Sequence, residues 1–247
     1  MPKLWEVSYD IAAVVILIML FLWYVNEKRI PLRSHRVFVV MLAVVLAATV
    51  LEIYVAGYVD KVQNLNDMGF KWLFSIKTML NCLVSVVFVW YAIVLSDLHR
   101  NPTNIYKKII TGVAVLLVIL NMLNPVTDWA YGFDGNRFTS YWAGYVLCGL
   151  VVLLIFGALV IMHKNLKDIT FVKASALAVN MMFILFCYLI QIQYNIHILN
   201  FSISVGCLTM YQYLNNPGAM TDETTKVFNR NLLGVCLKNE FSAGKRF

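Results

Sequence analysis

The sequence predicts an all-α membrane protein, a polytopic bundle of seven transmembrane helices with a short cytoplasmic C-terminal helix. Three observations predict this fold. The chain is 61% hydrophobic and 13% charged, whereas soluble domains are roughly 45–50% apolar and about 25% charged. Apolar runs long enough to cross a hydrocarbon core of roughly 30 Å recur along the chain. Basic residues gather in alternate loops between these runs.

Each apolar run is expected to form one transmembrane helix. The runs cover residues 8–25, 37–58, 72–95, 109–126, 141–162, 173–193 and 197–214. They are continuously apolar, whereas the strands of a membrane barrel alternate in segments of about ten residues, which excludes a barrel. The first run has no basic stretch before it and no small-residue cleavage site after it, so we expect it to be retained and not removed as a signal peptide.

The basic residues predict the orientation. The loops 26–36, 96–108 and 163–173, together with the tail, hold 15 of the 20 Lys and Arg residues. Because such residues stay on the cytoplasmic side of a membrane, the N-terminus is expected outside and the C-terminus in the cytoplasm. An odd number of crossings requires the same arrangement. Membrane orientation therefore explains most of the net charge of +7, and no nucleic-acid partner is expected.

The cysteines give no sign of a disulfide-stapled outer domain or of a metal site. They lie in predicted helices or in the tail, at Cys82, Cys148, Cys187, Cys207 and Cys236. Disulfides belong to oxidising compartments outside the cytoplasm, and no Cys and His residues have the spacing of zinc ligands. We expect no metal and no cofactor.

The outer loops are short. The longest, residues 127–140, is rich in aromatic and turn residues, and the loop 59–71 is polar. Neither can build an independent outer domain, so a small extracellular ligand would have to be recognised by the helix bundle or by these loops.

Two ionisable residues stand out inside the predicted helices. Glu52 and Lys77 are each about six residues from the outer end of a run, a depth of about 9 Å at the rise of an α-helix. Intramembrane charges are costly and often mark functional sites. The pair is therefore either part of a ligand or ion site, or a structural ion pair between consecutive helices. In a third interpretation Lys77 reaches outward to the membrane surface.

Amide side chains complete the candidate site. In the functional interpretation the outer-half pocket is also lined by Asn81, Asn121, Asn124, Gln191 and Asn200. Amides inside membranes more often join helices to one another than bind ligands, and Asn180 is expected to do so.

The composition changes at the end of the seventh run. Pro217 disfavours helix in the residue before it, so we expect a seven-helix region at 1–216 and a separate segment at 217–247. Within that segment Asn229 is a suitable N-cap for a short amphipathic helix. Such a helix needs a partner surface, which is either a missing domain or the lipid headgroups.

The start of this segment resembles a known signature. Residues 222–230, DETTKVFNR, are similar to the D-x-L-T-G-L-x-N-R motif that opens GGDEF domains, the catalytic domains of bacterial diguanylate cyclases. Asp222, Thr225, Asn229 and Arg230 match the motif, whereas Thr224 replaces its first Leu and Lys226 replaces its Gly. The likeness covers residues 222–247, and the seven-helix part resembles more loosely the membrane sensors of bacterial cyclases and histidine kinases.

The resemblance implies a function for the intact protein. Metal-binding and guanine-binding residues of the family would lie beyond Phe247, so we expect no diguanylate cyclase activity from this chain alone. It also implies a bacterial cell membrane and a homodimer, because cyclases bring two catalytic domains together. The leading hypothesis is the signal-sensing region of a diguanylate cyclase-like receptor, with its catalytic part missing.

A small seven-helix transporter or channel, with a polar site at Glu52 and Lys77, is the alternative. A retinal photoreceptor is excluded because the run 197–214 has no lysine to form the Schiff base.

Overall fold

The structure is a computed structural model of the chain. It describes residues 4–26, 33–59, 67–95, 105–134, 137–164, 171–194 and 198–214. Apart from one hairpin this part of the chain is helical. Its helices are α1 (Leu4–Asn26), α2 (Arg33–Val59), α3 (Met68–Leu95), α4 (Ile105–Thr127), α5 (Trp142–Lys164), α6 (Phe171–Tyr194) and α7 (Leu199–Leu214). The tail 217–247, with its expected C-terminal helix, lies outside the described residues.

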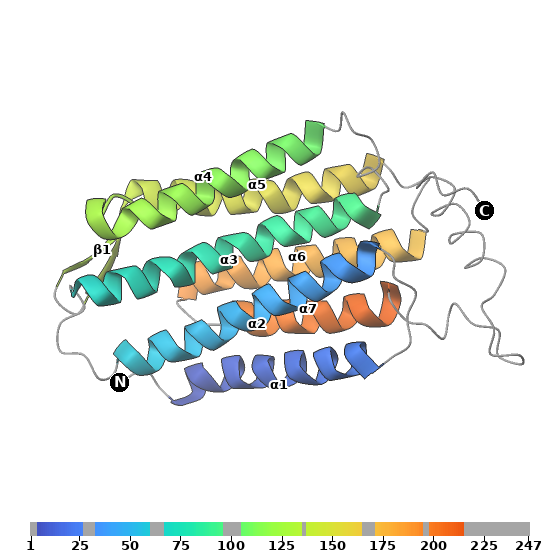
Figure 1. Ribbon diagram of the computed structural model, residues 1–247, viewed down its shortest axis with the longest axis horizontal. Coiled ribbons are helices and arrows are strands. Elements are labelled where there is room, and N and C mark those ends of the chain that lie inside the picture. The colour runs from blue at the N-terminus through green and yellow to red at the C-terminus, as the bar shows by residue number, and fades with distance from the viewer. Residues whose placement is uncertain are drawn as a thin grey trace, which may run out of the picture.

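The helices run side by side along one axis, in alternating directions, as Figure 1 shows. The strands β1 (Tyr131–Asp134) and β2 (Arg137–Ser140) sit at one end of the bundle, beside the start of α3 and the end of α4. We call this end the hairpin end. α3 is central to the packing, since it contacts α2, α4 and α5, while α1 packs against α2 and α7, and α6 packs against α7.

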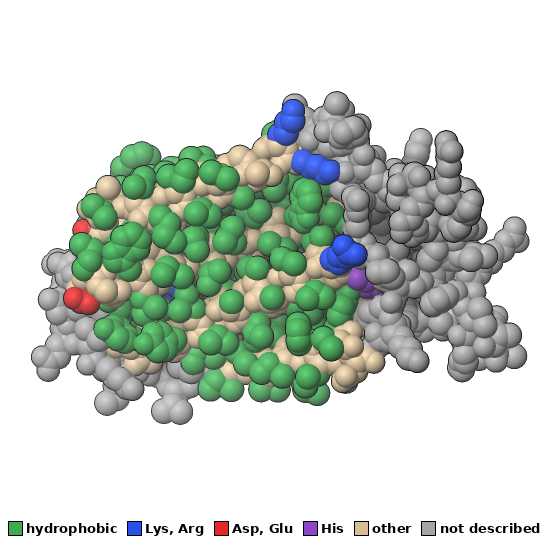
Figure 2. All heavy atoms as spheres, viewed as in Figure 1, with side chains coloured by type: hydrophobic (Ala, Val, Ile, Leu, Met, Phe, Trp, Pro, Cys, Tyr) green, Lys and Arg blue, Asp and Glu red, His purple; other side chains and the backbone are tan. Residues whose placement is uncertain are grey.

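The surface is that of a membrane protein. Four segments of the described residues are long and apolar enough to cross a bilayer, Ser8–Asn26, His35–Val59, Met68–Val94 and Lys107–Thr127, and shorter apolar segments lie in α5 and α6. Hydrophobic side chains cover the flank of the bundle in Figure 2, and charged side chains lie toward its ends. An apolar exterior of this kind is stable only when lipid replaces water around it.

Six of the seven helices extend beyond the apolar runs that predicted them, whereas α7 begins two residues later than its run. Each of α1 to α4 begins about one helical turn earlier than expected. At α3 the cause is a cap: the Asp67 carboxylate accepts a hydrogen bond of 3.1 Å from the Gly69 amide, and the Asp67 carbonyl accepts one of 3.0 Å from the Lys71 amide. An Asp at the N-cap satisfies donors that the helix itself leaves open. Hydropathy locates the hydrocarbon core, whereas caps locate the helix ends.

The hairpin was not anticipated. β1 and β2 pair in antiparallel register, with Tyr131 opposite Ser140 and Asp134 opposite Arg137. Two strands joined by two residues that include Gly are a recognised hairpin signal, and Gly135-Asn136 supplies them. The expectation that the loop 127–140 builds no separate domain holds, because its sheet has only these two strands within the described residues.

Candidate functional site

Glu52 and Lys77 form the ion pair that the sequence suggested. Lys77 Nζ lies 2.6 Å from Glu52 Oε1, and the two side chains are only 11% and 8% exposed. Counted from the end of α2 and the start of α3, they lie about 10 and 14 Å along the helices. The pair therefore joins two consecutive helices well inside the bundle, and Lys77 does not reach outward to the membrane surface.

Aromatic rings connect this pair to the hairpin. Lys77 Nζ lies 4.8 Å from the centre of the Phe74 ring, a favourable position for a cation over an aromatic face. The Phe74 ring in turn meets the rings of Tyr131 and Phe133 edge to face, at 5.1 and 5.2 Å between centroids. Phe70 also contacts Phe133, at 5.1 Å. The hairpin thus packs on α3 through aromatic contacts that begin next to the ion pair.

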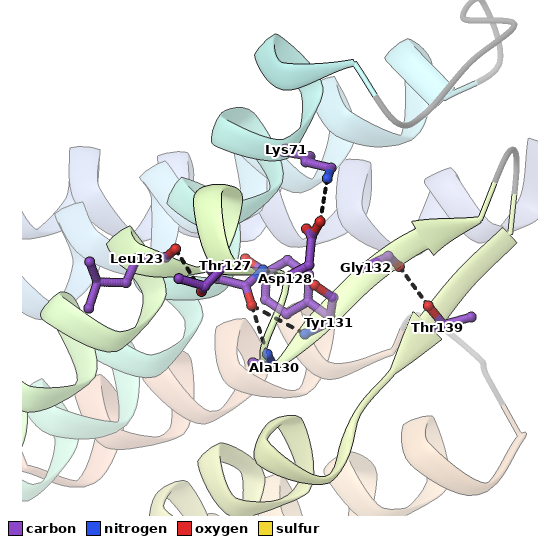
Figure 3. Close-up of polar contacts among 9 residues, drawn as sticks. Lys71, Leu123, Thr127, Asp128, Ala130, Tyr131, Gly132 and Thr139 are labelled. Atoms are coloured by element: carbon purple, nitrogen blue, oxygen red, sulfur yellow. Dashed lines mark hydrogen bonds and ion pairs between the residues drawn. The ribbon is translucent and has the colours of Figure 1, made fainter.

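Asn124 fastens the hairpin to α4. Its side chain is buried; its Oδ1 accepts hydrogen bonds from the amides of Ala130 (2.9 Å) and Tyr131 (3.3 Å), and its Nδ2 donates one of 3.0 Å to the Tyr131 carbonyl. Figure 3 labels Ala130 and Tyr131, whose amides donate two of these bonds. Backbone amides and carbonyls at the buried start of a strand need such hydrogen-bond partners. Asn124 was expected to line a ligand pocket, but its hydrogen bonds serve the hairpin.

Asp128 ends α4 with a left-handed residue. Its φ is +45°, a conformation that Asp adopts more readily than most residues other than Gly and Asn. Its amide donates to the Asn124 carbonyl at 2.8 Å, and its Oδ2 lies 2.6 Å from Lys71 Nζ. This second ion pair, drawn in Figure 3, ties the turn after α4 to the first turns of α3.

An internal cavity of about 220 Å³ lies between α3, α4, α5, α6 and α7. Its wall is mostly apolar, with Phe88, Leu147, Val151, Ile155, Met181 and Ile184 among the lining residues. The polar lining residues are Thr78, Asn81, Cys82, Ser85, Asn121, Tyr131, Cys148 and Tyr188. No lining residue carries a formal charge at neutral pH, which separates this cavity from the Glu52–Lys77 pair.

Tyr131 brings the hairpin into the cavity wall. Its hydroxyl lies 2.6 Å from Ser75 Oγ and 3.0 Å from Thr78 Oγ1. Burial raises the pKa of the Tyr131 hydroxyl, and the hydrogen bonds from these neighbours offset part of the rise. The hydroxyl is therefore neutral at physiological pH and holds the base of the hairpin against α3.

Among the described residues, Asn121 is the one lining residue with a buried side-chain N or O atom that lacks a hydrogen-bond partner. Its side chain is fully buried, its Nδ2 donates to the Leu117 carbonyl at 2.8 Å, and its Oδ1 has no partner. Nδ2 also approaches Cys82 Sγ at 3.9 Å. Exchanging the amide's O and N would set Oδ1 against the Leu117 carbonyl, so the network fixes the orientation. A buried acceptor without a donor costs about 1–3 kcal/mol.

The structure divides the residues expected in one site. Asn81 and Asn121 line the cavity. Glu52 and Lys77 are not among its lining residues and pair with each other instead. The side chain of Gln191 lies outside the described part of the chain, as do the signature residues Asp222, Thr225, Asn229 and Arg230.

Two other amides join helices. Asn200 of α7 donates to Asp10 Oδ1 of α1 at 3.3 Å, and both side chains are buried. Asn200 therefore does not contribute to the cavity as expected. Asn180 of α6 donates to the Gly206 carbonyl of α7 at 2.9 Å, which confirms its expected role between helices. Asp10 was missed because it lies near the start of its run, where a solvated carboxylate is ordinary.

The described residues hold no group of three or more His, Cys, Asp or Glu side chains that suits a metal ion. Comparison with protein-family models, with curated proteins and with solved structures gave no match for this chain. The case for a function therefore depends on the cavity, the membrane bundle and the residues themselves.

Proposed function

We propose that the chain is the membrane-embedded sensing region of a signalling receptor. The observation that carries the proposal is the cavity, which is lined by five helices and the hairpin and has among its lining residues Asn121, whose Oδ1 lacks a partner. Pockets of this kind, apolar with a few polar groups, are the usual form of small-molecule sites. A molecule that fits one arrangement of these helices better than another shifts the bundle toward it.

In this proposal all seven helices cross the bacterial cell membrane, with the N-terminus outside and the C-terminus in the cytoplasm. Support comes from the ends of the bundle: Arg36, Lys107 and Lys108 lie in the first turns of α2 and α4, opposite the hairpin end. Alkaline phosphatase fused at residue 66 or 135 should be active, and fused at residue 102 or 220 inactive. The reverse pattern would contradict both orientation and helix count.

We further propose that the output is cyclic-di-GMP synthesis by a GGDEF domain in a homodimer. The support is the likeness of residues 222–230 to the signature that opens such domains. α7 then connects the sensing cavity, through Leu199 and Ile203 in its wall, to the cytoplasmic segment.

A chimera tests the sensing function. The chain is joined after Arg230 to the remainder of an active GGDEF domain, and cyclic-di-GMP formation from GTP is measured in membranes. Val151→Phe fills the cavity, whereas Leu153→Phe introduces the same side chain at a position of the same helix that is 65% exposed. We expect Val151→Phe to change the rate about fivefold or more, within the usual range of allosteric coupling, and Leu153→Phe to leave it unchanged.

Equal rates in both folded variants would show that the bundle only anchors the output domain. Reconstituted vesicles test the transporter or channel alternative. Solute or ion flux that Glu52→Gln abolishes would support that alternative over sensing. The closed geometry of the Glu52–Lys77 pair favours a structural role.

A further inference from the structure

We propose that the cavity binds a small, uncharged and largely apolar molecule that carries one hydrogen-bond donor, and that this donor bonds to Asn121 Oδ1. The inference rests on the proposed function, because it names the ligand class of the same cavity. Its support lies in the charge, the size and the hydrogen-bonding state of the cavity wall.

The lining residues exclude a charged ligand. Thr78, Asn81 and Ser85 are the hydroxyl and amide groups that α3 contributes, and they are neutral. Lys77, which precedes the lining residue Thr78 in α3, is already neutralised by Glu52. An ion moved from water into this cavity would lose its hydration without gaining a counter-charge.

The volume limits the size of the ligand. An engineered protein cavity of about 150 Å³ lined by aliphatic and aromatic side chains binds benzene. The cavity here measures about 220 Å³. It therefore suits a molecule of about ten non-hydrogen atoms, such as a small bicyclic aromatic compound or a short branched alcohol.

The unmet acceptor specifies the polar group. Asn121 is a lining residue whose Oδ1 has no partner and less than 1 Å² of accessible surface, while Nδ2 of the same amide donates to the Leu117 carbonyl. A ligand's donor therefore reaches Oδ1 after a small movement of this side chain toward the cavity. An acceptor in that position selects an N–H or O–H donor and rejects an isosteric molecule that presents an oxygen lone pair. Sites built to hydrogen-bond a ligand discriminate strongly against analogues that lack the bonding group.

Indole and benzofuran form a matched pair of probes. They have nearly the same shape, but indole has an N–H donor and benzofuran has only an acceptor oxygen. Binding is measured by calorimetry on the purified 247-residue chain in lipid nanodiscs, with empty nanodiscs as the control for partition into lipid. We expect indole to bind with a Kd at least tenfold lower than benzofuran, a difference of about 1.4 kcal/mol.

Two variants and one control variant locate the site. Val151→Phe should abolish saturable binding of both probes, and Leu153→Phe should leave binding unchanged. Asn121→Leu should equalise the affinities of the two probes by removing the acceptor. If Asn121→Leu does not fold, the comparison of indole with benzofuran on the unaltered chain still tests whether the cavity selects a hydrogen-bond donor.

Equal affinities on the unaltered chain, or no saturable binding of either probe, would overturn the proposal; in the second case water would be the natural partner of Asn121. These outcomes can be distinguished from a failure of the proposed sensing function. Selective indole binding together with an unresponsive cyclase chimera would leave a binding site without a sensor. A chimera that responds to Val151→Phe, without indole binding, would leave a sensor with a different ligand.

Discussion

Two polar regions inside the bundle differ in how completely they are satisfied. The Glu52–Lys77 pair is charged, and its members lie 2.6 Å apart beside the Phe74 ring. The cavity that α3 shares with α4, α5, α6 and α7 has no charged lining residue, yet Oδ1 of the lining residue Asn121 has no partner. Both charges of the pair therefore have a partner, whereas the neutral cavity keeps an acceptor without a donor.

The difference shows that charge alone is a poor guide to a membrane site. A buried ion pair repays its desolvation only when both partners meet closely, and it can then serve simply to fix the packing of helices. A neutral cavity with an unmet acceptor gains a hydrogen bond when a ligand with a donor binds. Substitutions at four places in the bundle test this contrast, ordered from the largest expected effect to the smallest.

The largest effect is expected at the ion pair. Glu52→Leu or Lys77→Met alone should lower the free energy of unfolding by about 3–5 kcal/mol, because each strands one buried charge. The double variant should lose much less. Unfolding by sodium dodecyl sulfate in mixed micelles measures these values, and indole binding by the double variant should be unchanged. Losses that add in the double variant would contradict the pairing of Glu52 with Lys77. Lost indole binding would place the ion pair and the cavity in one site.

A smaller loss is expected at Asn124. Asn124→Ala removes the partners of the Ala130 and Tyr131 amides and of the Tyr131 carbonyl. Buried backbone groups left unpaired cost about 1–3 kcal/mol each, and partial access of water reduces the total to about 2–3 kcal/mol. The same titration measures the loss. Faster cysteine labelling at Cys148 would show that the hairpin closes the cavity; an unchanged labelling rate would mean that ligands enter elsewhere.

Tyr131→Phe should cost about 1 kcal/mol, the usual worth of one side-chain hydrogen bond. The folded-state pKa of Tyr131 is raised, so its neutral hydroxyl contributes stability that is complete below its ordinary pKa of about 10. That contribution is lost as pH rises through the folded-state pKa. The difference in stability between wild type and Tyr131→Phe should therefore shrink above pH 10; a constant difference up to pH 12 would contradict the assignment.

The smallest effect is expected at the Lys71–Asp128 pair. The Asp128 side chain is 40% exposed, so water replaces much of what Lys71 provides. Lys71→Met should change the free energy of unfolding by less than about 1 kcal/mol, as for other exposed pairs. A loss comparable to that of Lys77→Met would show that the exposed pair stabilises the fold as much as the buried pair does.

The sequence predicted some of this site and missed the rest for identifiable reasons. Glu52 and Lys77 were recognisable because charges are rare in apolar runs. Asn81 and Asn121 were recognisable only as amides, and nothing in their spacing separates them from Asn124 or Asn200, which hold the hairpin and α1. Asp67 was overlooked as a cap because the expected helix began at the edge of the apolar run.

Composition and charge by themselves determined that this chain is helical and belongs in a membrane, because lipid demands long apolar segments whose backbone bonds are internal. They also brought the ends of α2 and α3 close enough to make an ion pair plausible. Only the tertiary structure decided which amides face a neighbouring backbone and which faces a cavity. That outcome depends on how five helices rotate about their axes as they pack, and hydropathy carries no information on such rotation when nearly every face is apolar.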